Sequence, residues 1–354
     1  MPPPRPPRAC FPRAPRRAAL AAVTLAAAAL VPAPARAWDD VGHMAIAIVA
    51  WRHMTPVARE RAVALLRAAP PGAGLAQLRP NEGGPEARDL ALFARAATWP
   101  DLVRDRRDSV RWATYHHPTW HYLNWYWRAD SAGRPVVVTG LPTDSENVVE
   151  RITALRPVLA DASVPAASRA VALAWVMHLV GDIHNPVHTA SRVTAAHPEG
   201  DRGANLVHLT EDGRPTNLHA VWDDLFDGPG RRAGGAGRGA PGPEGLMADA
   251  ERAADAMERS TPAERVGGQV GEARPSVWAQ EGEAIDETAV YTPDLVDGGP
   301  VPAEYEARAR AVVLPRAALA GYRLATLLNQ TFGGTSPAAG PGAGPPSAGT
   351  SAGQ

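Results

Sequence analysis

Residues 165–188 read PAASRAVALAWVMHLVGDIHNPVH, a pattern that predicts a buried helix ending in a polar turn. The segment from Pro165 to Gly181 is apolar on nearly every side, so the helix belongs in a core. Asn185-Pro186 ends or turns it, because proline lacks the amide proton that a continuing helix needs. Comparable helical patterns occupy 43–54, 56–69, 144–160, 216–226, 277–290 and 302–329, and short extended segments lie at 134–139 and 205–210. We therefore predict an all-α fold with short β-hairpins.

The two ends of the chain do not share this pattern. Residues 1–37 carry arginines but no acid, then an uncharged apolar run, and finish in the small-x-small site Ala35-Arg36-Ala37. These features are typical of a secretory signal peptide and place Trp38 at the mature N-terminus. Gly, Pro, Ser and Ala dominate 333–354, which predicts a disordered tail, and the Gly/Pro/Arg-rich segment 228–245 predicts a flexible insertion. We therefore predict a single domain over residues 38–332. We also expect the protein to be exported from a bacterial cell, either to the periplasm or to the medium.

The composition becomes informative once this leader is set aside. The 354 residues include 36 basic residues, all arginine, against 37 acidic ones, for a net charge of −1. A hydrophobic content of 45% excludes a wholly disordered chain, and a single cysteine, Cys10, excludes a disulfide scaffold. Cleavage would remove six arginines and no acid, leaving 30 basic and 37 acidic residues, or −7, and no cysteine. An exported protein without disulfides depends on packing or on metal for its stability.

Polar side chains within the apolar helices indicate a metal site. His178 and Asp182 are four residues apart, one turn along the same helix face, and His219 and Asp223 in NLHAVWD (217–223) repeat this spacing. A single histidine in such a helix is usually a hydrogen-bonded core residue, but two His-x-x-x-Asp pairs are hard to explain by packing. Neutral imidazoles and carboxylates suit Zn²⁺. His188, His43, Asp101, His121 and the α-amine of a mature Trp38 are further candidate ligands.

With these motifs the chain resembles the zinc-dependent single-strand-specific nucleases, the mung bean nuclease type that plants, fungi and bacteria share. The resemblance runs from Trp38 to about Asn329. The segments that carry it are WDDVGH (38–43), WPDLVR (99–104), HYLN (121–124), HLVGDIHNPVH (178–188), GDRGANL (200–206), NLHAVWD (217–223) and GYRLATLLN (321–329). The spacing within HLVGDIHNPVH and NLHAVWD is the most specific part.

The resemblance implies three zinc ions in a cleft of one mainly helical domain, a fold of the trinuclear-zinc nuclease and phospholipase C type. It assigns Asp101, His121, His178 and Asp182 to one ion of a close pair, the amine and carbonyl of Trp38 with His43 and Asp182 to its partner, and His188, His219 and Asp223 to the third. Asp101, Asp182 and Arg104 become the catalytic residues, with Arg104 near the phosphate. The implied reaction is attack of zinc-bound hydroxide on phosphorus.

The same resemblance implies the substrates and their contacts. We expect single-stranded DNA and RNA to be cut to 5′-phosphate products, 3′-nucleotides to be hydrolysed, and the protein to act as a monomer without a membrane after signal cleavage. Tyr122 would stack a base, which is worth about 1–3 kcal/mol per base. Asn124, where fungal members have aspartate, and Asn205 would line the cleft, so the base preference stays open.

Two alternatives remain open at this level. A zinc-dependent phospholipase C uses the same trinuclear arrangement, although its last ligand is a glutamate where this chain has Asp223. A non-catalytic secreted protein stabilised by zinc would need metals closed off from water. Turnover of nucleic acid or of lipid separates the three classes.

Overall fold

The structure, a computed structural model, describes Met1 and residues 38–226 and 242–333. The predicted signal peptide lies outside the described residues except for Met1, as does the predicted tail except for Gly333. Most of the predicted 228–245 insertion is also outside them. Its last residues are not part of a loop, because Pro243 begins helix α9, where proline at the first helical position costs no hydrogen bond. The described residues from Trp38 onward belong to one compact unit.

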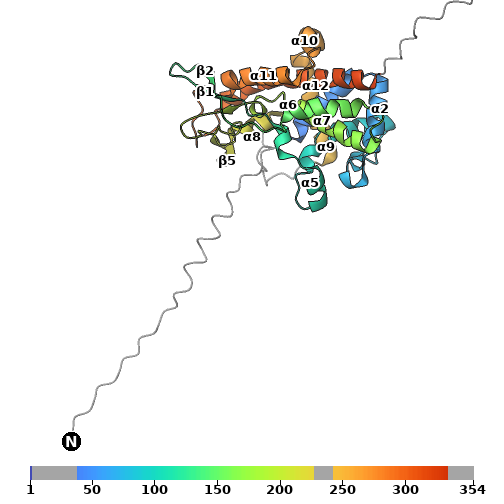
Figure 1. Ribbon diagram of the computed structural model, residues 1–354, viewed down its shortest axis with the longest axis horizontal. Coiled ribbons are helices and arrows are strands. Elements are labelled where there is room, and N and C mark those ends of the chain that lie inside the picture. Colours follow the sequence, from blue (N-terminus) through green and yellow to red (C-terminus); the bar gives the residue numbers. More distant parts are fainter. Residues whose placement is uncertain (2–37, 227–241, 334–354) are drawn as a thin grey trace, which may run out of the picture. The chain divides into compact units, whose positions relative to one another are not determined.

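Helices dominate the described residues, as the all-α prediction requires (Figure 1). The α-helices are α1 (Asp40–His53), α2 (Pro56–Arg67), α3 (Pro85–Ala96), α4 (Trp99–Leu102), α5 (Ser109–Tyr115), α6 (Val148–Ala160), α7 (Ala166–Asp182), α8 (Leu218–Asp223), α9 (Pro243–Ser260), α10 (Ala263–Val270), α11 (Pro275–Ile285) and α12 (Ala303–Phe332). Short helical turns are η1 (Pro71–Ala73), η2 (Ala76–Leu78), η3 (Pro118–His121), η4 (Pro186–His188), η5 (Asp224–Phe226) and the π-helical η6 (Asp286–Val290).

Helix α1 packs between α9 and α12 and also touches α7. Its N-cap is Asp39, whose carboxylate accepts a hydrogen bond from Gly42 N (2.8 Å). Every residue from Val41 to Trp51 is buried, so the helix has no solvent face. The close approach of α12 requires Gly321, since a Cβ there would lie 2.6 Å from Val49 Cγ1. In Figure 1, α11 and α12 run along one edge, α6 and α7 lie beneath them, and α5 stands at the opposite edge.

Helix α12 is long and apolar enough to cross a bilayer by length and composition, but 72% of its most apolar window is buried inside the protein. That burial is the pattern of a core helix. Two hydrophobic cores share the interior of the described unit: one surrounds Trp99 and Trp175, and the other surrounds Trp38 and Trp222.

The strands are few and short. β1 (Tyr126–Ala129) pairs antiparallel with β2 (Pro135–Val137) and parallel with β3 (Ser191–Arg192), while β4 (His208–Glu211) pairs antiparallel with β5 (Arg214–Asn217). The predicted extended segments at 134–139 and 205–210 thus fall on β2 and β4.

The predicted helices are confirmed with shifted ends, and five others among the described residues were missed. The helix expected at 216–226 begins only at Leu218, because Asn217 caps it by accepting from Ala220 N (2.8 Å), and it continues past Asp223 as η5. The helix expected at 277–290 becomes π-helical from Asp286. Helices α3, α4, α5, α9 and α10 were not predicted. α9 buries mainly alanines on its inner face, so its apolar pattern is weak in the sequence.

Candidate metal centre

Three groups of buried histidine and aspartate side chains have the arrangement of metal sites. They are His43, His178 and Asp182; Asp101, His121 and His178; and His188, His219 and Asp223. Within each group the potential ligand atoms all lie within 4.8 Å of one another. Every side chain predicted as a ligand from the sequence therefore belongs to one of these groups.

The first two groups meet at the C-terminal end of α7. Because His178 and Asp182 are one turn apart on this helix, His178 Nε2 lies 3.2 Å from Asp182 Oδ2. From η3, His121 Nδ1 approaches the same oxygen at 3.1 Å. From α1, His43 Nε2 lies 3.3 Å from the other oxygen, Oδ1. From α4, Asp101 Oδ1 lies 3.8 Å from His178 Nε2. Asp182 is thus approached by His178 from its own helix and by histidines from two other elements, α1 and η3.

The third group joins η4 to α8. His219 Nε2 and His188 Nε2 lie 3.2 Å and 3.5 Å from the two carboxylate oxygens of Asp223. Asn185 Nδ2 donates to Asp223 Oδ1 (2.9 Å) and fixes that carboxylate from the turn that ends α7. The turn after α7 therefore connects the third group to the first two.

Backbone carbonyls orient three of the imidazole rings. A carbonyl oxygen only accepts, so Nδ1 must carry the proton in His178, which donates to Ala97 O (2.8 Å), and in His188, which donates to His121 O (2.8 Å). His219 Nδ1 likewise donates to Gly203 O (2.6 Å). In its neutral form each ring then presents an unprotonated Nε2 to its carboxylate, which is the form and orientation that a metal ligand needs. Burial opposes protonation of His178, but without metal the carboxylates of Asp182 and Asp101 raise its pKa above the ordinary value.

The donor atoms of the centre lack partners that protein atoms can supply. Buried atoms without a hydrogen bond among the described residues include His43 Nε2, His121 Nε2, His188 Nε2, Asp182 Oδ1 and Asp223 Oδ2. The contact between His43 Nε2 and Asp182 Oδ1, although only 3.3 Å, lacks hydrogen-bond geometry. Buried polar groups are almost always paired. Imidazole nitrogen and carboxylate oxygen are also the zinc donor set, so the residues fit bound zinc.

The electrostatics of the centre agree with this fit. Burial lowers the pKa of His43 to about 4 and that of His121 to about 3, so both rings are neutral at pH 7. Burial opposes ionisation of Asp182, but the neighbouring His178 and His121 hold the pKa of its carboxyl well below its ordinary value. In the absence of metal, burial raises the pKa of Asp223 to about 7. A cation at the third group would favour the ionised carboxylate.

Arg104 lies at the edge of this centre, one turn after Asp101. Its Nε is 3.0 Å from Asp101 Oδ1, and 18% of its side chain is exposed. The sequence placed Arg104 beside the phosphate site, and the structure brings its charge next to a candidate ligand.

The residues predicted to bind substrate surround the same centre. Tyr122 follows His121 and is half-buried, with its hydroxyl bonded to the Asp144 carboxylate, and burial raises its pKa to about 12. Asn124 is partly exposed, and Leu123 N donates to His188 O (2.8 Å), which ties this segment to η4. Asn205 Nδ2 donates to Arg202 O (2.8 Å). The structure places these residues, while their contacts with substrate remain predictions.

Trp38 lies between the two halves of the centre. Its indole Nε1 donates to Gly181 O (2.8 Å), beside Asp182, and the next backbone amide, Asp39 N, donates to Asp223 O (3.0 Å). The residues that precede Trp38 in the sequence lie outside the described residues. The assignment of its amine and carbonyl to a zinc ion stays a prediction.

Sequence reasoning missed the buried carboxylate that organises the loop 200–205. Asp201 is 1% exposed, and its Oδ1 accepts from Arg192 N (3.0 Å) and Ala204 N (3.1 Å). The loop holds Arg202 (φ 58°) and Ala204 (φ 65°) in the left-handed region that favours glycine. Such strain persists only where surrounding contacts enforce it. GDRGANL carried the signal for this loop, but not the role of its aspartate.

His184, within the ligand-rich segment, is not part of any group. Its Nδ1 donates to Val180 O (2.7 Å), and its Nε2 accepts from Arg323 Nη1 (2.9 Å), a guanidinium that also pairs with Glu281 (2.7 Å). These contacts give His184 a supporting role just after the end of α7.

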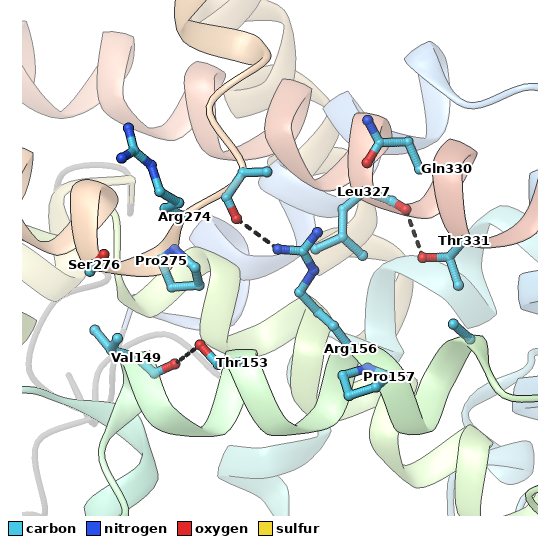
Figure 2. Close-up of a pocket in the computed structure, with 12 residues that line it drawn as sticks. Val149, Thr153, Arg156, Pro157, Arg274, Pro275, Ser276, Leu327, Gln330 and Thr331 are labelled. Atoms are coloured by element: carbon cyan, nitrogen blue, oxygen red, sulfur yellow. Dashed lines mark hydrogen bonds between the residues drawn. The ribbon is translucent and has the colours of Figure 1, made fainter.

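A pocket of about 630 Å³ lies away from these groups, between α6, α11 and α12 (Figure 2). Arg156 crosses it and donates from Nη1 to Ala273 O (2.7 Å). The other lining residues are Val149, Thr153, Pro157, Ala160, Arg274, Pro275, Ser276, Leu327, Gln330 and Thr331. None of them is a predicted ligand or substrate contact, so the metal centre is a separate site.

Comparison with known proteins identifies the family that shares this centre. The sequence profile described as S1/P1 Nuclease matches residues 38–333. The chain belongs to the S1/P1 nuclease family. Nuclease P1 of Penicillium citrinum is 22% identical over 318 residues, which cover 84% of this chain and 98% of that protein. Nuclease S1 of Aspergillus oryzae is 39% identical over 64 residues, 18% of this chain and 19% of that protein. Endonuclease 4 of Arabidopsis thaliana is 38% identical over 55 residues, 16% of each.

Membership of the S1/P1 nuclease family makes the protein a hydrolytic nuclease and confirms the predicted family and its mainly helical fold. The two shorter matches span less than a fifth of those relatives, whereas the match to nuclease P1 spans almost all of it. The family depends on zinc, and the three buried groups are the places in the described residues where such ions fit.

Proposed function

We propose that this S1/P1 nuclease is an exported, monomeric enzyme that hydrolyses single-stranded DNA and RNA to 5′-phosphate products and also hydrolyses 3′-nucleotides. Three zinc ions would serve it. The observation that carries the proposal is the convergence of three buried His/Asp groups in which several donor atoms, among them His43 Nε2, His188 Nε2 and Asp223 Oδ2, lack hydrogen-bond partners among the described residues.

The ligands divide among three ions as the family resemblance implies. Asp101, His121, His178 and Asp182 would hold one, Trp38, His43 and Asp182 its neighbour, and His188, His219 and Asp223 the third. When bound, such ions polarise a phosphoryl oxygen and lower the pKa of coordinated water toward about 7. Asp182 would thus be a ligand of both of the first two ions.

The protein residues then bind and orient the phosphodiester. Arg104 keeps its guanidinium against Asp101 and so holds a fixed positive charge at the edge of the centre. A preorganised cation of this kind stabilises charge that develops on the phosphate in the transition state. Tyr122 would stack a base beside His121, and Asn124 and Asn205 would contact its edge. Bases paired in a duplex are not available for such stacking, which supports the preference for single strands.

One experiment separates the proposed activity from its alternatives. The protein beginning at Trp38 is incubated with denatured DNA, RNA, 3′-AMP and phosphatidylcholine, with and without a chelator. We expect chelator-sensitive turnover of the nucleic acids and of 3′-AMP, with 5′-phosphate ends on the fragments. Cleavage of the lipid alone would establish a phospholipase C, and turnover of no substrate would establish a zinc-stabilised protein without catalysis.

A matched pair of variants ties the activity to the centre. Asp182→Asn and Asp286→Asn each replace a fully buried aspartate by its amide, but only Asp182 faces the candidate ligands. We expect Asp182→Asn to lose activity by at least about a hundredfold, since it removes a charge shared by two ions. Asp286→Asn is expected to retain activity. Equal activity in both variants would refute the assignment.

Export has its own test. The exported protein is recovered from cells that express the full chain, and its first residue is sequenced. We expect Trp38, because cleavage after Ala37 would create the proposed amine ligand. A different mature N-terminus would contradict both the predicted signal peptide and that ligand.

A further inference from the structure

Residues 103–112 (VRDRRDSVRW) place four arginines next to the metal centre, and the structure distinguishes one of them. Three pair with carboxylates: Arg104 with Asp101 (3.0 Å), Arg107 with Asp105 (2.7 Å) and Arg111 with Asp108 (3.4 Å). Arg106 is exposed, and among the described residues it forms no ion pair. The positive charge of Arg106 is therefore the one that no neighbouring carboxylate offsets directly.

An aromatic side chain holds Arg106 instead. Its Cζ lies 5.0 Å from the ring centroid of Trp112, within the range of a cation–π contact. The ring of His116 also lies near Trp112, and the two ring centroids are 5.7 Å apart. The contact limits the freedom of the guanidinium and so lowers the entropy cost of binding an anion.

Trp112 has no evident role in the packing of the protein. Trp120, eight residues away in η3, packs against the core around Trp175, but Trp112 packs against neither hydrophobic core of the described residues. A large aromatic side chain outside the core, carrying an exposed arginine, is typical of surfaces that bind single-stranded nucleic acid.

This surface lies within electrostatic reach of the centre. Burial lowers the pKa of His116. The positive charges of Arg104 and Arg106 lower it further, whereas the nearby Asp101 raises it. His116 is therefore close to a predicted zinc ligand as well as to Arg106. Arg104 is only two residues from Arg106 along the chain, and the charges of both arginines act on His116.

We propose that Arg106, held on Trp112, binds the phosphate of the nucleotide adjacent to the scissile bond. The site takes a phosphate group within a single strand, because a guanidinium matches phosphate geometry and the base beside it can lie against the partly exposed Trp112. This inference rests on the proposed nuclease function. A 3′-nucleotide, which has only the one phosphate, would not reach Arg106.

The test compares a thymidine octamer with 3′-AMP as substrates of the zinc-loaded protein. In Arg106→Ala, the ratio of KM for the octamer to KM for 3′-AMP is expected to rise about tenfold, the effect of losing one charge-assisted phosphate contact. Arg107→Ala is the matched control, since that neighbouring arginine is 91% exposed and bound to Asp105. Its ratio is expected to match the wild type.

Salt dependence supplies a readout that a merely structural role would not change. Each phosphate neutralised on a single strand contributes about 0.7 to the slope of log(kcat/KM) against log salt concentration. Arg106→Ala should reduce the slope for the octamer by about that amount, and Arg106→Lys should restore it, because lysine keeps the charge. Equal slopes and equal KM ratios in wild type and Arg106→Ala would overturn the proposal.

A binding measurement distinguishes failure of this inference from failure of the proposed function. Fluorescence anisotropy of a labelled thymidine octamer is measured with each variant in the presence of chelator, where no cleavage occurs. Weaker binding by Arg106→Ala than by Arg107→Ala supports the site even if the wild type cleaves neither substrate. Equal binding by the two variants overturns it even if the wild type is an active nuclease.

Discussion

Replacement of Asp201 by alanine should both destabilise the protein and weaken its third metal group. This carboxylate is buried under the loop 200–205, where it accepts from Arg192 N, Ala204 N and the hydroxyl of Tyr291 (2.5 Å). Burial raises the pKa of Tyr291 well above its ordinary value, so its hydroxyl remains a donor over the accessible pH range. Asp201→Ala would leave all three donors without their acceptor.

The size of the effect follows from these contacts. A buried donor without a partner costs about 1–3 kcal/mol, so three cost about 6 kcal/mol. Without the carboxylate the loop can leave the left-handed conformation at Arg202 and Ala204, which recovers about 3 kcal/mol. The expected net loss in the free energy of unfolding is therefore about 3 kcal/mol.

The same loop connects Asp201 to a candidate ligand. Gly203 O accepts the Nδ1 proton of His219, so relaxation of the loop would free this imidazole ring. Loss of such an outer hydrogen bond typically lowers metal affinity by about 10- to 100-fold. Zinc titration of the chelator-treated protein should show this loss at one of the sites and no change at the others.

Urea denaturation in the presence of chelator measures the stability change without the contribution of metal. Tyr291→Phe is the control, because it removes one donor and leaves the carboxylate its two backbone partners; we expect a loss of about 1 kcal/mol. The reasoning would be refuted if Asp201→Ala changed the free energy of unfolding by less than about 0.5 kcal/mol, within the range of an ordinary surface substitution, and bound zinc like the wild type.

Three further predictions address other parts of the centre. Gly181→Ala places a Cβ 2.8 Å from His43 Nδ1. Although alanine favours the helix, this substitution should displace the His43 ring and lower the zinc content by one ion. An unchanged zinc content would count against the packing described. Burial raises the pKa of Asp286 well above its ordinary 3.8, so the carboxyl is protonated on folding and stability is lost as pH rises above 3.8. The reference is Asp286→Asn, which can keep the hydrogen bond from Trp127. In chelator-treated protein, the stability of wild type relative to this variant should fall from pH 3.5 to pH 8, and a constant difference would contradict the reasoning. A protein with extra residues before Trp38 should lose activity and one zinc ion; three zinc ions and full activity would exclude the amine ligand.

The sequence by itself identified the candidate ligand side chains and the helical class. His178 with Asp182 and His219 with Asp223 were identifiable because a spacing of four residues fixes the relative position of two side chains on a helix, whatever surrounds it. The apolar pattern of 165–181 likewise required burial. The sequence did not reveal helices with weaker apolar patterns, such as α9. It also did not give the ends of α8 and α11, where a cap or a π-helical turn depends on a few contacts.

Only the tertiary structure decided how these local pieces combine. His121 and Asp182 are 61 residues apart in the chain, and Trp38 and Gly181 are 143 apart, so no periodicity connects them. The roles of Asp201 under its loop and of Trp112 beneath Arg106 are of the same kind. Local geometry is encoded by spacing along the chain, whereas contacts between distant residues depend on how whole helices pack, and single-residue patterns do not specify that packing.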